Sequence, residues 1–149
     1  WDGGREKAPA AICRKMIQAL DKEELQITIW GDGEQTRSFM YIDDCVKGID
    51  RITHCDDLIA TPINLGSSEL VSINTLVSKV EKIAGKRLKR TYDLNAPRGV
   101  AGRNSDNTFI QEVLGWEPNT QLDKGLAVTY RWIKDQYNRR KAGEHVGVG

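Results

Sequence analysis

The chain has 149 residues, of which 39% are hydrophobic and 29% are charged, and its formal net charge is +1 at pH 7. This length and composition are typical of one soluble globular domain. The near-neutral charge disfavours nucleic acid and anionic membranes as partners. The sequence also lacks an apolar run of the roughly 18–20 residues that a membrane span requires.

The few cysteines indicate a reducing compartment, so we expect a cytoplasmic protein. Cys13, Cys45 and Cys55 form no CxxC pair, and their odd number argues against a disulfide framework. The two histidines, His54 and His145, provide too few ligands for zinc, which takes about four. We therefore expect no metal site.

The start of the chain predicts one helix and two strands. Residues 8–20 carry apolar side chains at helical spacing. Residues 25–31 alternate in apolar character and are rich in β-branched side chains, which predicts a strand. Gly31 and Gly33 predict a tight turn, so we expect a hairpin whose second strand covers residues 38–42.

Two further helices are predicted around a short strand. Asp43 or Asp44 can cap the first of them. Its apolar positions are Cys45, Val46, Ile49 and Ile52. Residues 61–67 predict the strand, and Ser72 then caps the helix with the most regular apolar stripe in the chain, which Gly85 closes.

The last third of the chain predicts an edge strand, a loop and two helices. The strand covers residues 87–93, and residues 95–107 have loop composition. A short helix is expected over residues 107–115 and a long one from about 121 to 141. Residues 142–149 are expected to be a flexible tail.

Several aromatic and sulfur-containing residues are predicted to be structural. Trp30, Trp116 and Trp132 are interpreted as core anchors rather than stacking platforms. Cys13 and Cys45 lie on or beside apolar helix faces, which is typical of small core residues rather than nucleophiles.

Three loops carry more charge than a simple connection needs. In chain order they contain Arg5, Glu6 and Lys7; Gln35 and Arg37; and Arg98 and Arg103. Glycine allows close backbone approach, and the planar guanidinium suits phosphate. If the loops converge, they form a site for a diphosphate. In the alternative interpretation, each arginine is solvated or in a weak surface pair.

The glycine turn at residues 31–33 differs from the loop that binds NAD. It joins two predicted strands, whereas a G-x-G-x-x-G loop joins a strand to a helix. We expect no cofactor-binding residues in this chain.

Two segments resemble a known family. Residues 30–49, WGDGEQTRSFMYIDDCVKGI, resemble the G-D-G-x-Q-x-R-x-F-x-Y-x-D-D run of extended short-chain dehydrogenase/reductases that act on nucleotide sugars. Residues 103–133 resemble the common ending of these proteins, with L-G-W-x-P before a long helix. Residues 1–15, WDGGREKAPAAICRK, resemble the GDP-mannose 3,5-epimerases more narrowly, as do VAGRNSDN and the serine after Arg37.

The resemblance implies a fold and a chemistry. The fold is α/β: the C-terminal substrate-binding part of such an enzyme, a small mixed sheet with packed helices, without the NAD-binding Rossmann domain. The chemistry is conversion of GDP-D-mannose to GDP-L-galactose by C4 oxidation with NAD, C3/C5 epimerisation and re-reduction.

The resemblance also implies roles for individual residues. Lys7 is the implied proton donor, with Glu6 and Ala8 lining the sugar pocket and Lys15 approaching the substrate. Gln35, Thr36 and Arg37 are the implied GDP contacts, with Arg37 near the diphosphate, and Arg103 is a second phosphate contact.

The family's glycine-rich NAD loop, Y-x-x-x-K pair and cysteine base have no counterpart here. We therefore expect residues 1–141 to form a substrate-binding domain that is inactive alone and exposes apolar surface. The partners implied are a GDP-sugar, an N-terminal Rossmann domain that binds NAD, and a second copy in a homodimer. The alternatives are a fragment of another nucleotide-sugar epimerase or dehydratase, a non-catalytic nucleotide-sugar-binding module, and an interaction domain.

Overall fold

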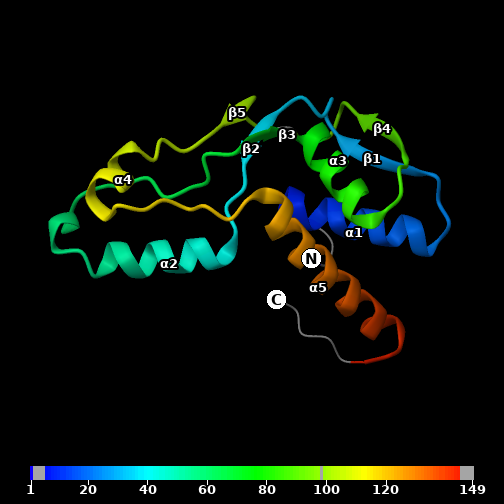
Figure 1. Cartoon of the computed structure of the whole chain (residues 1–149). Coiled ribbons are helices and arrows are strands. Elements are labelled where there is room, and N and C mark those ends of the chain that lie inside the picture. Colours follow the sequence, from blue (N-terminus) through cyan, green and yellow to red (C-terminus); the bar gives the residue numbers. More distant parts are fainter. Residues whose placement is uncertain (2–5, 98, 145–149) are drawn as a thin grey trace.

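The computed structural model describes residues 1, 6–97 and 99–144 (Figure 1). The helices are α1 (Ala8–Asp21), α2 (Ile42–Thr53), α3 (Ile73–Ala84), α4 (Thr108–Leu114) and α5 (Leu122–Lys141), with a short 3-10 helix, η1 (Asp56–Leu58). The strands are β1 (Gln26–Trp30), β2 (Thr36–Ser38), β3 (Leu70–Ser72), β4 (Lys89–Asp93) and β5 (Gly102–Arg103).

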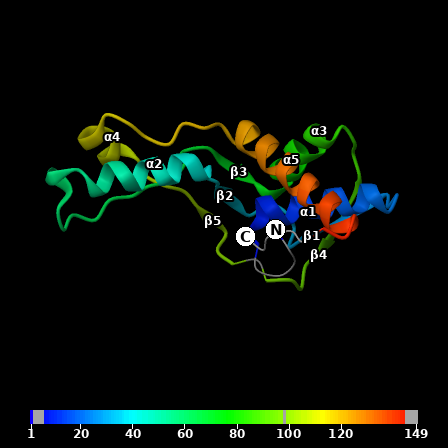
Figure 2. The same cartoon turned by 90° about the horizontal axis from the view of Figure 1, so that it is seen from below.

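The molecule consists of a packed body and an arm. In the body, α1, α3 and α5 pack on one another, and α1 also contacts β1. Both views show α2 and α4 extending away from this body, at the far end from β1 and β4 (Figures 1 and 2). Strands β2, β3 and β5 lie between the two parts (Figure 1).

The described strands form two small sheets rather than one. Strand β1 pairs in parallel with β4, from Gln26 opposite Lys89 to Trp30 opposite Asp93. In the second sheet β2 is central, antiparallel to β3 and parallel to β5. The expected α/β fold with a small mixed sheet is confirmed, although the sheet is divided.

The core lies between the three body helices and β1. Met16, Leu76, Val77 and Ile133 are almost fully buried. The predicted stripe and caps of α3 are confirmed. Ser72 Oγ accepts a hydrogen bond from the Thr75 amide, and the cap glycine adopts φ +69°.

The predicted hairpin is wrong. Gly31 and Gly33 do form a turn, with φ 75° and 78°, but β1 and β2 belong to different sheets. The turn's carbonyls accept bonds from the N-terminal amides of α3 instead of closing a hairpin: Ile73 N–H donates to Gln35 O and Asn74 N–H to Gly33 O. The helix end thus takes the place of a paired strand.

Two predicted strands lie elsewhere in the chain, and one strand was not predicted. The strand expected at residues 38–42 lies earlier, as β2, and the one expected at 61–67 lies later, as β3. Strand β5 lies inside the segment predicted as loop. Strands β2, β3 and β5 have at most three residues each, which is too short for the alternation that identifies a strand.

Asp44 does not cap α2, and neither does Asp43. The N-cap position is Tyr41, without a side-chain cap bond. Asp44 is buried, and its Oδ2 accepts bonds from the amides of Asn119 (3.1 Å) and Thr120 (2.7 Å), just before α5. The carboxylate therefore ties the arm to the start of α5.

The environments of the tryptophans and of Cys45 differ from those predicted, whereas that of Cys13 agrees. Trp30 and Trp132 are 55% and 47% exposed, so their assignment to the core is wrong. Trp116 is half-buried. Cys13 is fully buried as predicted, and burial raises the pKa of its thiol to about 12, whereas Cys45 is only half-buried.

The apolar stripe of α2 is exposed. Ile42, Val46 and Ile49 are 61%, 59% and 53% exposed, which confirms the apolar surface expected of the isolated chain. None of the helices within the described ranges is long and apolar enough to cross a membrane. Of the predicted tail, residues 145–149 lie outside the described residues.

Candidate functional site

Two of the predicted phosphate contacts are neighbours across a strand pair. Arg37 on β2 is the register partner of Arg103 on β5, and the strands are parallel, so both side chains lie on the same face of the sheet. Like charges at opposed positions repel each other. An anion bound between them would neutralise this repulsion.

Arg37 also joins two of the charged loops. Its Nη1 donates to Thr36 O (2.6 Å) and its Nη2 to Val100 O (2.5 Å), which lies in the loop before β5. A Cβ on Gly99, whose φ is +67°, would lie 3.5 Å from Nη2. Arg5 and Arg98, both predicted in these loops, lie outside the described residues.

Gln35 lies between the glycine turn and β2. Its Nε2 donates to Trp30 O (3.1 Å), while its Oε1 is buried without a hydrogen-bond partner among the described residues. Such unpaired buried acceptors are rare. The residue lines a hollow of about 370 Å³ together with Asp32, Glu34 and residues 99–101. This rim offers acceptors, which suit hydroxyl and N–H groups of a nucleoside.

Lys15 is held on the exposed face of β1. Its Nζ donates to Thr28 O (2.8 Å) and lies 5.5 Å from the centre of the Trp30 ring. Burial lowers the pKa of Lys15, and the neighbouring charge of Arg14 lowers it further, against the opposing effect of Glu6. Trp30 therefore connects Lys15 with the glycine turn.

The exposure of Trp30 could have been predicted. Ile27 and Ile29 are buried on β1, so the alternation places Trp30 on the outer face with Thr28.

The segment before α1 has a buried acid and an exposed base. The Glu6 side chain is 5% exposed and accepts bonds from Arg14 Nε (3.1 Å) and Nη2 (2.5 Å). Lys7 occupies the N-cap position and is exposed. Ala8 begins the helix and packs against the core. Arg14 lies eight residues from Glu6, so the sequence offers no helical i, i+4 signal for this pair.

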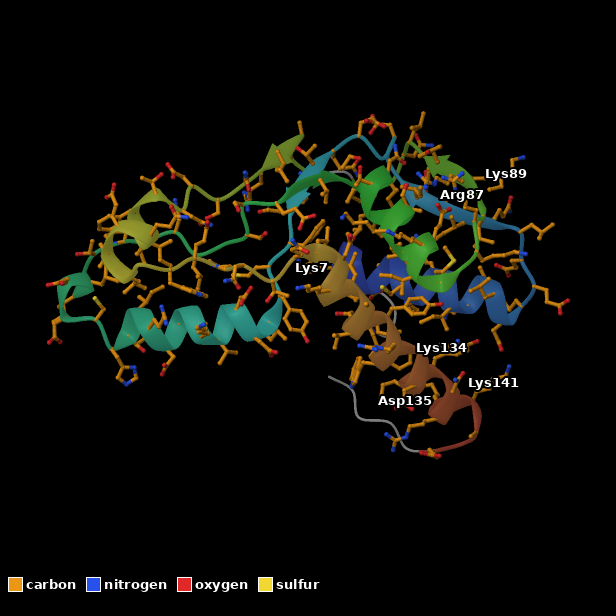
Figure 3. The ribbon with its side chains drawn as sticks, in the orientation of Figure 1. Lys7, Arg87, Lys89, Lys134, Asp135 and Lys141 are labelled. Atoms are coloured by element: carbon orange, nitrogen blue, oxygen red, sulfur yellow. The ribbon has the colours of Figure 1, made fainter. Side chains whose placement is uncertain are left out.

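Figure 3 shows Lys7 at the start of α1, well apart from the cations Arg87 and Lys89 beyond α3. The structure thus brings Thr36, Arg37 and Arg103 into one sheet, with Gln35 directly before it and Lys15 linked to Gln35 through Trp30. Lys7 and Glu6 belong to a separate segment of the same body.

The described residues do not fit NAD. The glycine turn leads into β2, and α3, which begins directly after β3, has no glycine at its start. Neither arrangement gives the glycine-rich strand-to-helix cradle that a dinucleotide diphosphate requires. Within the same part of the chain, no group of three or more His, Cys, Asp or Glu side chains is placed to hold a metal.

The sequence matches known proteins that act on nucleotide sugars. Residues 3–66 match the model of the NAD dependent epimerase/dehydratase family. Over 95% of its length, the chain is 49% identical to the GDP-mannose 3,5-epimerase of Arabidopsis thaliana, of which it covers 36%. By sequence, the chain belongs to the NAD dependent epimerase/dehydratase family. This confirms the predicted family.

Other members of the family agree in sequence and in fold. The GDP-mannose 3,5-epimerase 1 of Oryza sativa subsp. indica is 48% identical, with 95% of this chain and 35% of that protein covered. The UDP-glucuronic acid 4-epimerase from Bacillus cereus, solved in complex with NAD, is 31% identical with a TM-score of 0.71. That comparison covers 91% of this chain and 42% of the other. The chain thus spans well under half the length of these relatives.

Proposed function

We propose that this chain is the C-terminal substrate-binding part of an NAD-dependent nucleotide-sugar epimerase that acts on GDP-mannose. The observation that carries the proposal is the pair of register partners Arg37 and Arg103 on one face of a sheet. Two guanidinium groups at this spacing suit the dianionic diphosphate of a nucleotide sugar. The 49% identity to a GDP-mannose 3,5-epimerase supports GDP-mannose over other nucleotide sugars.

Different residues bind different parts of the substrate. Arg37 and Arg103 bind the diphosphate, and the acceptor-rich rim around Gln35 binds nucleoside hydroxyl and N–H groups. Thr36, the first residue of β2, lies between Gln35 and Arg37 in the chain. Lys15, whose Nζ already binds Thr28 O, approaches the substrate from the Trp30 side.

Lys7 is the proposed proton donor of the epimerisation. Removing a proton beside a sugar ketone and returning it on the opposite face requires an acid that reaches the ring carbon. Lys7 is exposed at the start of α1, while the buried ion pair of Glu6 with Arg14 fixes the backbone next to it. Glu6 and Ala8 would form the wall beside the sugar.

The rest of the reaction falls outside this chain. NAD supplies hydride exchange at C4 in this family, and the described residues do not fit it. We therefore assign NAD to an N-terminal Rossmann domain of the intact protein, which would be a cytoplasmic homodimer. The exposed face of α2 is the surface that this domain would cover, and the chain alone would be inactive.

Calorimetric titration of the full-length protein tests the substrate class. We expect GDP-mannose to bind more tightly than UDP-glucose. Arg37→Ala and Arg103→Ala should each weaken binding by about 1.5–3 kcal/mol, the usual loss for a charge-assisted contact. Arg87→Ala, which removes an exposed arginine beyond α3, serves as the control (Figure 3). Unchanged affinity in both site variants would refute the diphosphate contact, and preference for UDP-glucose would refute the GDP assignment.

A further inference from the structure

Asn74, at the start of α3, contacts the glycine turn through both its side chain and its backbone. Its Nδ2 donates to Asp32 O (3.3 Å) and to Glu34 Oε1 (2.6 Å). Its backbone N–H donates to Gly33 O (2.9 Å). Three consecutive residues of the turn are therefore bonded to one residue of the helix.

The amide of Asn74 also packs directly against the turn. A Cβ on Gly33 would lie 2.4 Å from Asn74 Oδ1 and 2.6 Å from its Cγ and Nδ2. Real Cβ atoms do not approach other atoms so closely. The turn therefore fits this side chain only because residue 33 has none.

Strand β4 holds Asn74 from the other side. Tyr92 Oη donates to Asn74 Oδ1 (3.0 Å), and Arg90 Nη1 donates to Asn74 O (3.2 Å). Arg90 is itself fixed by the buried carboxylate of Glu81 (2.6 Å). Asn74 therefore connects the turn to the other sheet and has little freedom to move.

The turn leads directly into the proposed binding residues. Ile73 N–H donates to Gln35 O (3.2 Å), so the helix end also fixes the residue after the turn. Arg37 follows two residues later. We propose that Asn74 is a positioning residue for substrate binding, which holds the turn so that Gln35 meets the nucleoside and Arg37 meets the diphosphate. This inference rests on the proposed function.

Hydrogen–deuterium exchange on the 149-residue chain tests the positioning. Asn74→Asp keeps the size of the side chain and the acceptor for Tyr92 but removes the Nδ2 donor and repels Glu34. We expect the amides of residues 31–37 and Ile73 to exchange about tenfold faster, since opening of this turn becomes easier. Val80→Ala, in the buried part of the same helix, is the control for general destabilisation. It should not speed exchange of these amides more than exchange elsewhere in the chain.

A double variant that exchanges the hydrogen-bond donor and acceptor should rescue the turn. Combining Asn74→Asp with Glu34→Gln restores a donor and an acceptor at the 2.6 Å contact with their direction exchanged. Exchange in the turn should return toward the wild-type rate. Unchanged exchange in Asn74→Asp would overturn the inference.

Kinetics of the full-length protein test the consequence for substrate. Asn74→Asp should raise KM about tenfold with little change in kcat, because the loss is in binding. In a background that combines Gln35→Ala with Arg37→Ala it should add little, since it acts through those two residues. If Arg37→Ala weakens binding while Asn74→Asp does not, the positioning role alone is wrong. If the wild-type protein binds no nucleotide sugar, the proposed function is overturned and this inference with it.

Discussion

Neighbouring residues before α1 have opposite environments. Glu6 is buried in an ion pair with Arg14, whereas Lys7 is exposed. A buried charge costs free energy unless it is paired, so breaking this pair would leave an uncompensated charge. The Glu6–Arg14 pair therefore fixes the backbone from which Lys7 extends. Loss of Glu6 should affect stability, whereas loss of Lys7 should affect turnover.

Lys7→Ala should lower kcat of the full-length enzyme by about 10²–10⁴-fold, the usual contribution of a positioned acid, with little change in KM. Lys7→Arg is the matched control. It keeps the positive charge but holds its proton too tightly to donate it, so its turnover should also fall. A raised KM with unchanged kcat would make Lys7 a binding residue only.

Cys13 gives a pH dependence of stability. Burial raises its pKa from the ordinary value of 9.0 to about 12 in the folded chain. Above pH 9 the thiol ionises only in the unfolded chain, so the free energy of unfolding should fall by up to about 1.4 kcal/mol per pH unit. Denaturant titrations from pH 8 to 11 measure this slope. Cys13→Ala should be less stable at pH 8 but should show a flatter decline, and parallel declines would contradict the assignment.

Short elements define the proposed substrate face. Strand β5 approaches β2 closely at Gly102, where an added Cβ would lie 2.8 Å from Thr36 Oγ1. The glycine therefore permits the pairing that places Arg103 beside Arg37. Strand β5 and the candidate site therefore both depend on the close approach of Gly102 to Thr36.

Gly102→Ala should lower the thermal unfolding midpoint by several degrees and weaken binding of GDP-mannose, because the two strands must move apart. Differential scanning calorimetry and titration measure the two effects. Adding Thr36→Ala removes the clashing atom and should recover the midpoint. If the double variant stays as unstable as Gly102→Ala, another contact is responsible.

An element could be predicted where the residues that define it are close together in the sequence, and could not where its partners are distant. α3 could be predicted because its stripe, Ser72 and Gly85 are local signals. Strand β5 could not, because two residues carry no pattern and its partner lies in a distant segment. In the candidate site, the resemblance predicted Arg37 and Arg103 as contacts, but the contacts of Asn74 and Arg14 form only in the folded chain.

At the scale of the whole molecule, the arm presents an apolar surface. Ile42, Val46 and Ile49 lie on one side of α2 and are each more than half exposed. Contiguous apolar surface of this kind normally marks an interface. The body helices, by contrast, bury their apolar faces against one another.

The isolated chain should therefore self-associate as its concentration rises, and Val46→Glu should reduce this. Sedimentation velocity over a concentration series measures it. Lys134→Gln, on the exposed side of α5, changes the net charge by the same amount without touching the face (Figure 3). Equal association of the two variants would exclude α2 as the contact.

The parallel pairings have a consequence for how the chain folds. The contact of Arg37 with Val100 and that of Thr28 with Thr91 each join residues 63 positions apart. Closing such long loops costs entropy before any contact forms, and non-local pairing slows folding. We expect α3 and its local caps to form early and the proposed nucleotide-binding surface to assemble last.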